Sequence, residues 1–106
     1  MSDAAWSVYL VRRADGALYT GIALDVARRF AQHEAGGLRA AKSLRGQGPL
    51  RLVRAHVVGA KGSALSVERR LKRLPKARKE ALARSQRALA CFVAECGRVG
   101  ARWGGR

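Results

Sequence analysis

The sequence has no long apolar run and only two cysteines. No segment approaches the ~20 consecutive apolar residues of a membrane-spanning helix, and the N-terminus MSDAAWSVYL lacks the basic and apolar regions of a secretory signal. We therefore expect a soluble protein in the cytoplasm. Cys91 and Cys96 lie on an expected helix, where their side chains diverge, and no Cys-x-x-Cys or His/Cys metal spacing is present. We expect reduced thiols and not metal ligands.

Negative charge is also scarce. The chain has 7 Asp and Glu against 22 Lys and Arg, which gives a formal net charge of +15 at pH 7. The positive charges of such a surface repel one another, and binding to a polyanion relieves that repulsion. Nucleic acid is the leading candidate, because neutralising its phosphates releases counterions and favours binding without sequence contacts. An anionic membrane surface is the rival partner.

The chain is too short for two separate hydrophobic cores. Its 106 residues are 48% hydrophobic and 27% charged, which is typical of a folded domain and too apolar for disorder. We therefore predict a single domain over residues 1–96 and a flexible tail over residues 97–106.

Both tyrosines of the chain lie in one short stretch, VYLVRRADGALYTG, over residues 8–21. Two β-prone segments flank Asp15-Gly16, and Asp-Gly is a strong hairpin signal because Gly tolerates positive φ. This pattern predicts an antiparallel hairpin with Tyr9 and Tyr19 on adjacent strands. Cross-strand aromatic packing is a sufficient explanation for the pair taken alone.

A helix is predicted after the hairpin. Asp25 is suited to cap it, Val26 and Phe30 begin an apolar stripe, and Gly36 is suited to end it. Three side chains are expected away from that stripe: Arg28, Arg29 and His33.

Residues 36–49 are basic and rich in glycine and include no acidic residue, which is typical of a loop. Its basic side chains are Arg39, Lys42 and Arg45. They either track a nucleic-acid backbone or form an ordinary solvated loop.

The remaining sequence supplies a third strand and further helices. The segment LRLVRAHVV over residues 50–58 is β-prone, and Ser63 is suited to cap a helix that runs to about Leu74. Residues 76–96 favour helix, with a break near Ser85. The order ββαβα plus a C-terminal helix predicts a small α+β domain with a three-stranded antiparallel sheet flanked by helices.

One carboxylate lies in an unusual position. On a helical wheel of about 100° per residue, Val67 and Leu71 belong to the apolar stripe of the second helix, and Glu68 lies beside that stripe. An anion there needs a cation. An i,i+4 ion pair with Lys72 is one solution. A divalent metal ion held by one or two carboxylates, phosphate oxygens and water is the other.

In their order along the chain, these residues resemble the GIY-YIG endonucleases. Val8-Tyr9-Leu10 stands at the family's GIY element, and Tyr19-Thr20-Gly21 stands at YIG in the second strand of the same hairpin. The segment TGIALDVARRFAQHEAG is similar to the family's capped helix with its Arg and His, and VER to the segment with its metal-binding Glu. The resemblance covers roughly residues 6–82 and is closest to small stand-alone bacterial GIY-YIG proteins.

The resemblance implies a role for each matched residue. Tyr9 matches the tyrosine that activates or orients the attacking water, and Tyr19 the one that positions water or phosphate. Arg29 matches the arginine that stabilises the scissile phosphate, for which its planar fork is suited. Glu68 matches the carboxylate that holds one Mg²⁺ or Mn²⁺. His33 matches the family's histidine, which donates to a phosphate, orients Tyr9 or does neither.

A tyrosine is a poor base at neutral pH unless nearby cations lower its pKa. We expect Arg29, His33 and Lys72 to lower the pKa of Tyr9. The sequence also departs from the family pattern. Val8 replaces a glycine, Ile22 stands where other branches have a polar residue after YIG, and the chain has no Asn.

We therefore predict a metal-dependent DNA endonuclease that works in repair or recombination. Its expected substrate is branched or single-stranded DNA, and the protein is expected to be a monomer or a homodimer. The predicted catalytic residues are Tyr9, Tyr19, Arg29, His33 and Glu68, with Glu68 as the metal ligand. The predicted substrate-binding residues are Arg28, Arg39, Lys42, Arg45 and Lys72. The alternative is a non-catalytic nucleic-acid-binding module on the same fold. A membrane-surface protein fits less well, because the basic residues are scattered and no long helix has a clean apolar face.

Overall fold

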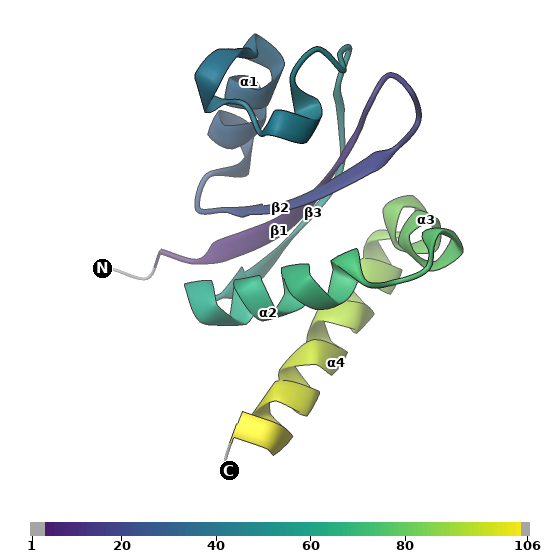
Figure 1. Cartoon of the computed structure of the whole chain (residues 1–106). Helices are drawn as coiled ribbons and strands as arrows, with labels where there is room; N and C mark the ends of the chain where they lie inside the picture. The colour runs from purple at the N-terminus through teal and green to yellow at the C-terminus, as the bar shows by residue number, and fades with distance from the viewer. Residues whose placement is uncertain (1–3, 105–106) are drawn as a thin grey trace.

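The computed structural model describes residues 4–104, with side chains over residues 4–97. It confirms the predicted α+β fold, a three-stranded antiparallel sheet flanked by helices in the order ββαβα plus C-terminal helices (Figure 1). The elements are β1 (Trp6–Arg12), β2 (Leu18–Ala23), α1 (Val26–Ala35), β3 (Arg51–Gly59), α2 (Lys61–Lys72), α3 (Lys76–Arg84) and α4 (Gln86–Gly104), with 3-10 turns η1 (Gly37–Arg39) and η2 (Lys42–Leu44) between α1 and β3.

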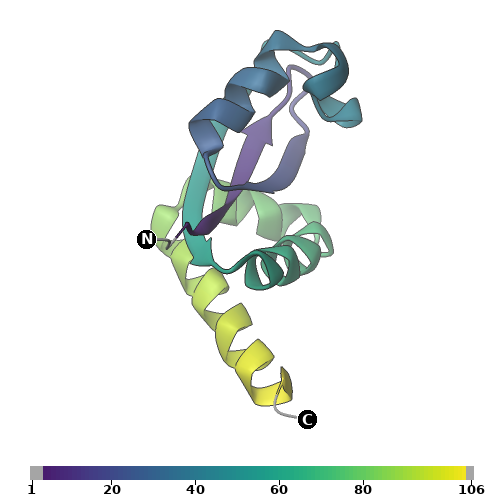
Figure 2. The same cartoon turned by 90° about the vertical axis from the view of Figure 1, so that its left-hand side faces the viewer.

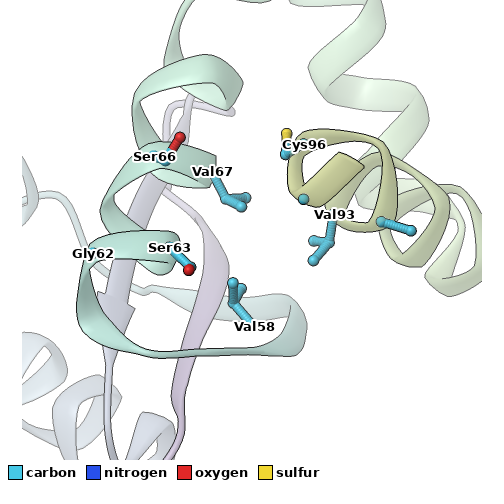
Figure 3. A pocket seen from close by; sticks show the side chains of 9 residues that line it. Val58, Gly62, Ser63, Ser66, Val67, Val93 and Cys96 are labelled. Carbon is cyan, nitrogen blue, oxygen red and sulfur yellow. The ribbon is translucent and has the colours of Figure 1, made fainter. Parts of the chain in front are cut away.

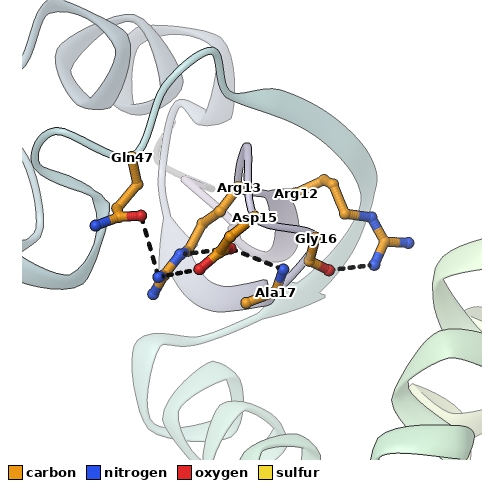
Figure 4. Close-up of polar contacts among 6 residues, drawn as sticks. All are labelled: Arg12, Arg13, Asp15, Gly16, Ala17 and Gln47. Carbon is orange, nitrogen blue, oxygen red and sulfur yellow. Dashed lines mark hydrogen bonds and ion pairs between the residues drawn. The ribbon is translucent and has the colours of Figure 1, made fainter.

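The predicted hairpin is confirmed, and its first strand lies at the centre of the sheet. The strand order is β2-β1-β3, and in the hairpin register Tyr9 faces Gly21. Gly16 adopts a φ of 91° in the turn, and the Asp15 carboxylate accepts a 3.0 Å hydrogen bond from the Ala17 N–H (Figure 4). Arg13 pairs with the same carboxylate. The Asp-Gly dipeptide thus closes the turn by both backbone freedom and side-chain bonding.

The sheet carries a different core on each face. Val8 and Leu10 of β1 pack into the cluster formed with α2, α3 and α4. Tyr9 and Val11 point the other way and pack with residues of α1 and the loop after it. This alternation is the period-2 pattern of a strand covered on both faces. Figures 1 and 2 show α1 on one side of the sheet and the three later helices on the other.

The first helix begins and ends as predicted, but one of its side chains does not point where we expected. Asp25 accepts a 3.0 Å hydrogen bond from the Arg28 N–H, and Gly36 ends the helix with a φ of 75°. The prediction that His33 points away from the apolar stripe is wrong, because His33 is only 1% exposed. His33 follows Val26 by nearly two full helical turns, so the two side chains share a face.

The second helix starts earlier than predicted. Its N-cap is Ala60, so Ser63 lies inside the helix and does not cap it. The predicted break near Ser85 is confirmed: Ser85 separates α3 from α4, and its Oγ accepts a 3.0 Å hydrogen bond from the Ala88 N–H.

The last helix is longer than predicted. α4 continues past Cys96 to Gly104, so most of the predicted flexible tail is helical, and residues 105–106 lie outside the described part. Single glycines cost a helix only about 1 kcal/mol each and do not have to end it. Even so, no helix within residues 4–104 combines the length and apolar character needed to cross a membrane.

Candidate active site

The site is built around a buried hydrogen bond between β1 and α1. The Tyr9 hydroxyl oxygen lies 2.8 Å from His33 Nε2, and each residue is 1% exposed. Tyr9 is oriented by its strand and His33 by the inner face of the helix. The structure therefore brings together two predicted catalytic residues that lie far apart in the sequence.

The backbone determines which nitrogen of His33 carries the proton. The Ala41 N–H, in the loop after α1, donates to His33 Nδ1 at 3.2 Å, so Nδ1 is the unprotonated nitrogen of the neutral ring. The proton must then be on Nε2, which donates to the Tyr9 oxygen. His33 therefore holds the Tyr9 hydroxyl oxygen by a hydrogen bond. The hydroxyl proton of Tyr9 remains available for another acceptor.

Burial governs the acidity of this pair. It raises the pKa of Tyr9 above the ordinary 10.0, neighbouring Tyr19 raises it further, and Arg29 only partly offsets the rise. Of the three cations expected to lower the pKa of Tyr9, only Arg29 does so, and burial outweighs it. His33 is a neutral donor, and Lys72 is paired with Glu68. Burial, and then Arg29, lowers the pKa of His33 below the ordinary 6.5. Both groups are therefore neutral in the free protein at pH 7.

The second tyrosine lies beside this pair. Tyr19 is half-buried, and its ring centroid is 6.2 Å from that of Tyr9 and 5.5 Å from that of His33. The predicted cross-strand packing of the tyrosines is thus present together with the histidine. Because Tyr19 is the more exposed phenol, it is the better placed of the two to meet a substrate.

Gly21 leaves the space that the Tyr9 ring occupies. A Cβ at this position would lie 2.6 Å from the Tyr9 oxygen and 2.7 Å from its Cζ. The phenol therefore crosses directly over the partner strand at its glycine. This contact explains on steric grounds why the third residue of Tyr19-Thr20-Gly21 is a glycine.

Arg29 is near the tyrosines and already bonded. Its Nη1 donates to Gln32 Oε1 at 2.8 Å and to the carbonyl of Arg39 at 2.6 Å. It is also close enough to affect the pKa of both Tyr9 and His33. Sequence reasoning missed Gln32, although its position three residues after Arg29 on a helix is a signal for such a contact.

Glu68 belongs to the other side of the sheet. Its neighbour Val67 packs in the core beneath α2, and the Glu68 carboxylate lies 3.4 Å from Lys72 Nζ. The predicted i,i+4 ion pair is therefore present. Among the described side chains, no hydrogen bond or ion pair joins Glu68 to the group of Tyr9, Tyr19, Arg29 and His33.

The residues present are compatible with a metal bound mainly through water and phosphate. No cluster of three or more His, Cys, Asp or Glu side chains that could hold a metal ion occurs among the described residues. Mg²⁺, however, commonly uses only one or two carboxylates and completes its shell with water and phosphate oxygens. Glu68 is 18% exposed and its partner Lys72 is 55% exposed, so the ammonium group can move aside. Glu68 therefore fits the role of a single protein ligand.

The predicted substrate-binding residues fall into different settings. Arg28 and Arg39 line a groove along the outer side of α1, and Lys42 is exposed on η2. Arg45 instead holds the loop together, since it donates to the carbonyls of Ala40 at 3.2 Å and Leu38 at 3.1 Å.

A second hollow, of about 640 Å³, lies between α2 and α4, away from this site (Figure 3). Its lining includes three valines, two serines and Cys96. None of the predicted site residues is among those that line it. Burial raises the pKa of the Cys96 thiol, so its environment does not activate it as a nucleophile.

The fold and this group of side chains define a class of protein. The family model of the GIY-YIG catalytic domain matches residues 5–81. The chain belongs to the GIY-YIG family, a nuclease superfamily whose members generally use a divalent metal ion.

Similar proteins have been named in bacteria. The chain is 54% identical over 82 residues to a UPF0213 protein of Yersinia pestis strain Pestoides F, covering 77% of this chain and 84% of that protein. It is equally similar to a UPF0213 protein of Yersinia pseudotuberculosis strain YPIII. The solution NMR structure of a UPF0213 protein of Bacillus halodurans is 38% identical and covers 74% of this chain and 81% of that one, with a TM-score of 0.48.

Proposed function

We propose that this protein is a metal-dependent endonuclease that hydrolyses DNA phosphodiester bonds and that it works in DNA repair or recombination in the cytoplasm. The observation that carries the proposal is the hydrogen bond from His33 to Tyr9, next to Tyr19 and Arg29. Membership of a nuclease superfamily supports the reaction class. The net charge of +15 supports a polyanionic substrate.

In this proposal Tyr9 orients the attacking water as a neutral phenol. His33 occupies one lone pair of the Tyr9 oxygen and thereby directs the hydroxyl proton toward the substrate side. Burial opposes ionisation of Tyr9, so the free enzyme does not hold a phenolate. Deprotonation of Tyr9 would require the added positive charge of a bound metal ion, because the phosphate of the substrate is an anion and opposes it.

Arg29 binds the scissile phosphate after it gives up its present contacts. Its bonds to Gln32 and to the Arg39 carbonyl hold the guanidinium beside the tyrosines. A phosphate offers charged oxygens, which form stronger hydrogen bonds to a guanidinium than a carbonyl does. Tyr19, the more exposed phenol, contacts the same phosphate or its water.

Glu68 would hold the divalent ion, with Lys72 released from the carboxylate. When bound, Mg²⁺ or Mn²⁺ supplies positive charge that stabilises the leaving oxygen. One such site cuts one strand, so a monomer nicks its substrate and double-strand cleavage requires a homodimer.

The test is cleavage of end-labelled branched and single-stranded DNA by the wild type and by Glu68→Gln over a series of Mg²⁺ and Mn²⁺ concentrations. We expect metal-dependent nicking by the wild type, and its loss in Glu68→Gln with binding retained. Glu95→Gln is the matched control, because Glu95 is an exposed carboxylate on α4 and should leave cleavage unchanged.

Tight binding without cleavage under any metal would contradict the proposal. It would support the alternative of a non-catalytic nucleic-acid-binding module on this fold. Equal cleavage by the wild type and Glu68→Gln would show that Glu68 is not the metal ligand, while the nuclease activity would still be supported.

A further inference from the structure

An exposed leucine lies beside the candidate active site. Leu38, in the η1 turn, is 91% exposed. It lines a groove of about 550 Å³ with two alanines of α1, Ala31 and Ala35. Three polar side chains share the groove: Arg28, Gln32 and Arg39.

The turn that presents Leu38 is held by arginines from both sides. The carbonyls of three consecutive residues, Leu38, Arg39 and Ala40, accept hydrogen bonds from Arg45 or Arg29 at 2.6 to 3.2 Å. A water-exposed leucine is thus presented on a braced loop, one residue from the carbonyl that Arg29 binds. Bracing of this kind lowers the entropy that would be lost on binding a ligand.

The chemistry of the groove matches a nucleotide whose base is unpaired. The faces of a base are apolar, its edge carries hydrogen-bonding groups, and its flanking phosphates are anionic. Leu38 and the two alanines supply the apolar surface, Gln32 an amide, and Arg28 and Arg39 the positive charge. Neither arginine forms an ion pair among the side chains of residues 4–97.

We propose that this groove binds one unpaired nucleobase of the DNA strand next to the scissile phosphate, with Leu38 packed against the base. The inference rests on the proposed function and adds the subsite that would select DNA with unpaired nucleotides at the cut. Aliphatic side chains commonly take the place of a stacked neighbour when a base step is opened. In an intact duplex both faces of each base are already stacked, so duplex DNA gains nothing from Leu38.

The test measures binding by fluorescence polarisation in EDTA, so that it does not depend on cleavage. A labelled single-stranded oligonucleotide and its blunt duplex are compared with the wild type, Leu38→Ala and Leu65→Ala. We expect Leu38→Ala to weaken single-strand binding about five-fold, as loss of partial burial of a leucine side chain predicts, and to leave duplex binding unchanged. Leu65→Ala makes the same deletion at a leucine 38% exposed on α2 and should change neither.

Arg39→Ala supplies a second comparison. Because a phosphate contact carries no base information, this variant should weaken single-strand and duplex binding alike. A single-stranded RNA of the same sequence shows whether the groove also accepts ribonucleotides; much tighter RNA binding that depends on Leu38 would overturn the assignment to DNA.

Three further results would overturn the inference. Leu38→Ala could leave single-strand binding unchanged or weaken both DNA forms equally. The wild type could also self-associate without DNA in a way that Leu38→Ala abolishes, which would make the groove a contact between copies. In each of these cases, metal-dependent cleavage by the wild type would still support the proposed function. Leu38-dependent single-strand binding without any cleavage would instead support the groove as a binding site and contradict the proposed nuclease activity.

Discussion

His33 donates its Nε2 proton to the hydroxyl oxygen of Tyr9 across a distance of 2.8 Å, while the Ala41 N–H binds Nδ1 on the other side of the ring. The backbone thus determines the tautomer, and the tautomer determines the direction of the tyrosine hydroxyl. A strand, a helix and a loop must all be in place for this contact to form. Several measurable consequences depend on it.

Substitution of Gly21 by alanine should displace Tyr9. The new Cβ would meet the Tyr9 oxygen at 2.6 Å, so the ring must move away from His33. We expect a loss of about 1–3 kcal/mol in the free energy of unfolding, measured by urea denaturation. Because a displacement of about 1 Å can cost about a hundred-fold in rate, cleavage should fall by a similar factor.

Gly62→Ala is the control for that substitution. Gly62 lies in α2, and a Cβ there meets nothing within 4 Å. Alanine should therefore leave cleavage unchanged and keep or raise stability, because it favours a helix over glycine by about 0.8–1.0 kcal/mol. Equal effects of the two substitutions would show that Tyr9 is not held over Gly21.

The pH dependence of stability should contain a contribution from His33. Its pKa is lowered on folding below the ordinary 6.5, so below about pH 6.5 the unfolded chain binds a proton that the folded protein resists. The contribution of His33 to stability is complete above that pH and is lost as the pH falls, by at most about 1.4 kcal/mol per pH unit for one proton.

The measurement compares urea unfolding of the wild type and His33→Gln at several pH values between 5 and 7.5. The variant should be less stable throughout but should lose less stability on acidification. His56 and the carboxylates are common to both proteins and cancel in the difference. Parallel curves would mean that His33 titrates normally in the folded protein.

The ion pair between Arg12 and Glu80 should stabilise the fold without serving catalysis. Two hydrogen bonds, of 2.6 and 2.8 Å, join the hairpin to α3, and the side chains are 21% and 23% exposed. Glu80→Gln should therefore lower the free energy of unfolding by about 1–2 kcal/mol and leave the rate of cleavage per folded molecule unchanged.

Glu34→Gln is the comparison for Glu80. Glu34 is exposed and forms no ion pair with a described side chain, so its change should stay within about 0.5 kcal/mol. If both variants lose the same free energy of unfolding, the loss comes from the change in net charge and not from the ion pair between Arg12 and Glu80.

Local patterns in the sequence were enough to predict the framework of the site. The Asp15-Gly16 turn signal predicted the hairpin with its two tyrosines, and Asp25 predicted the start of α1, because each depends on contacts within a few residues. The ion pair of Glu68 with Lys72 was predictable for the same reason, since both lie on one helix.

The contacts that decide the chemistry were not predictable in this way. The raised pKa of Tyr9 comes from burial, and the Ala41 N–H reaches His33 only because the chain folds back after α1. The direction of the His33 side chain could have been predicted. Its spacing from Val26 places it on the inner face of α1, but we expected a polar residue to lie on the outer face. Arg29 donates to a backbone carbonyl of η1, and no sequence pattern predicts this contact because every residue has a backbone carbonyl.

The most direct test of the account is single-turnover cleavage of end-labelled branched DNA in Mg²⁺ by the wild type and Tyr9→Phe, with binding measured in parallel. Tyr9→Phe keeps the ring over Gly21 and removes only the oxygen to which His33 donates. We predict metal-dependent cleavage by the wild type and a loss of about 10²-fold or more in the variant, with DNA affinity retained. Cleavage by Tyr9→Phe at the wild-type rate would contradict the central claim that the oriented phenol acts on the reacting water.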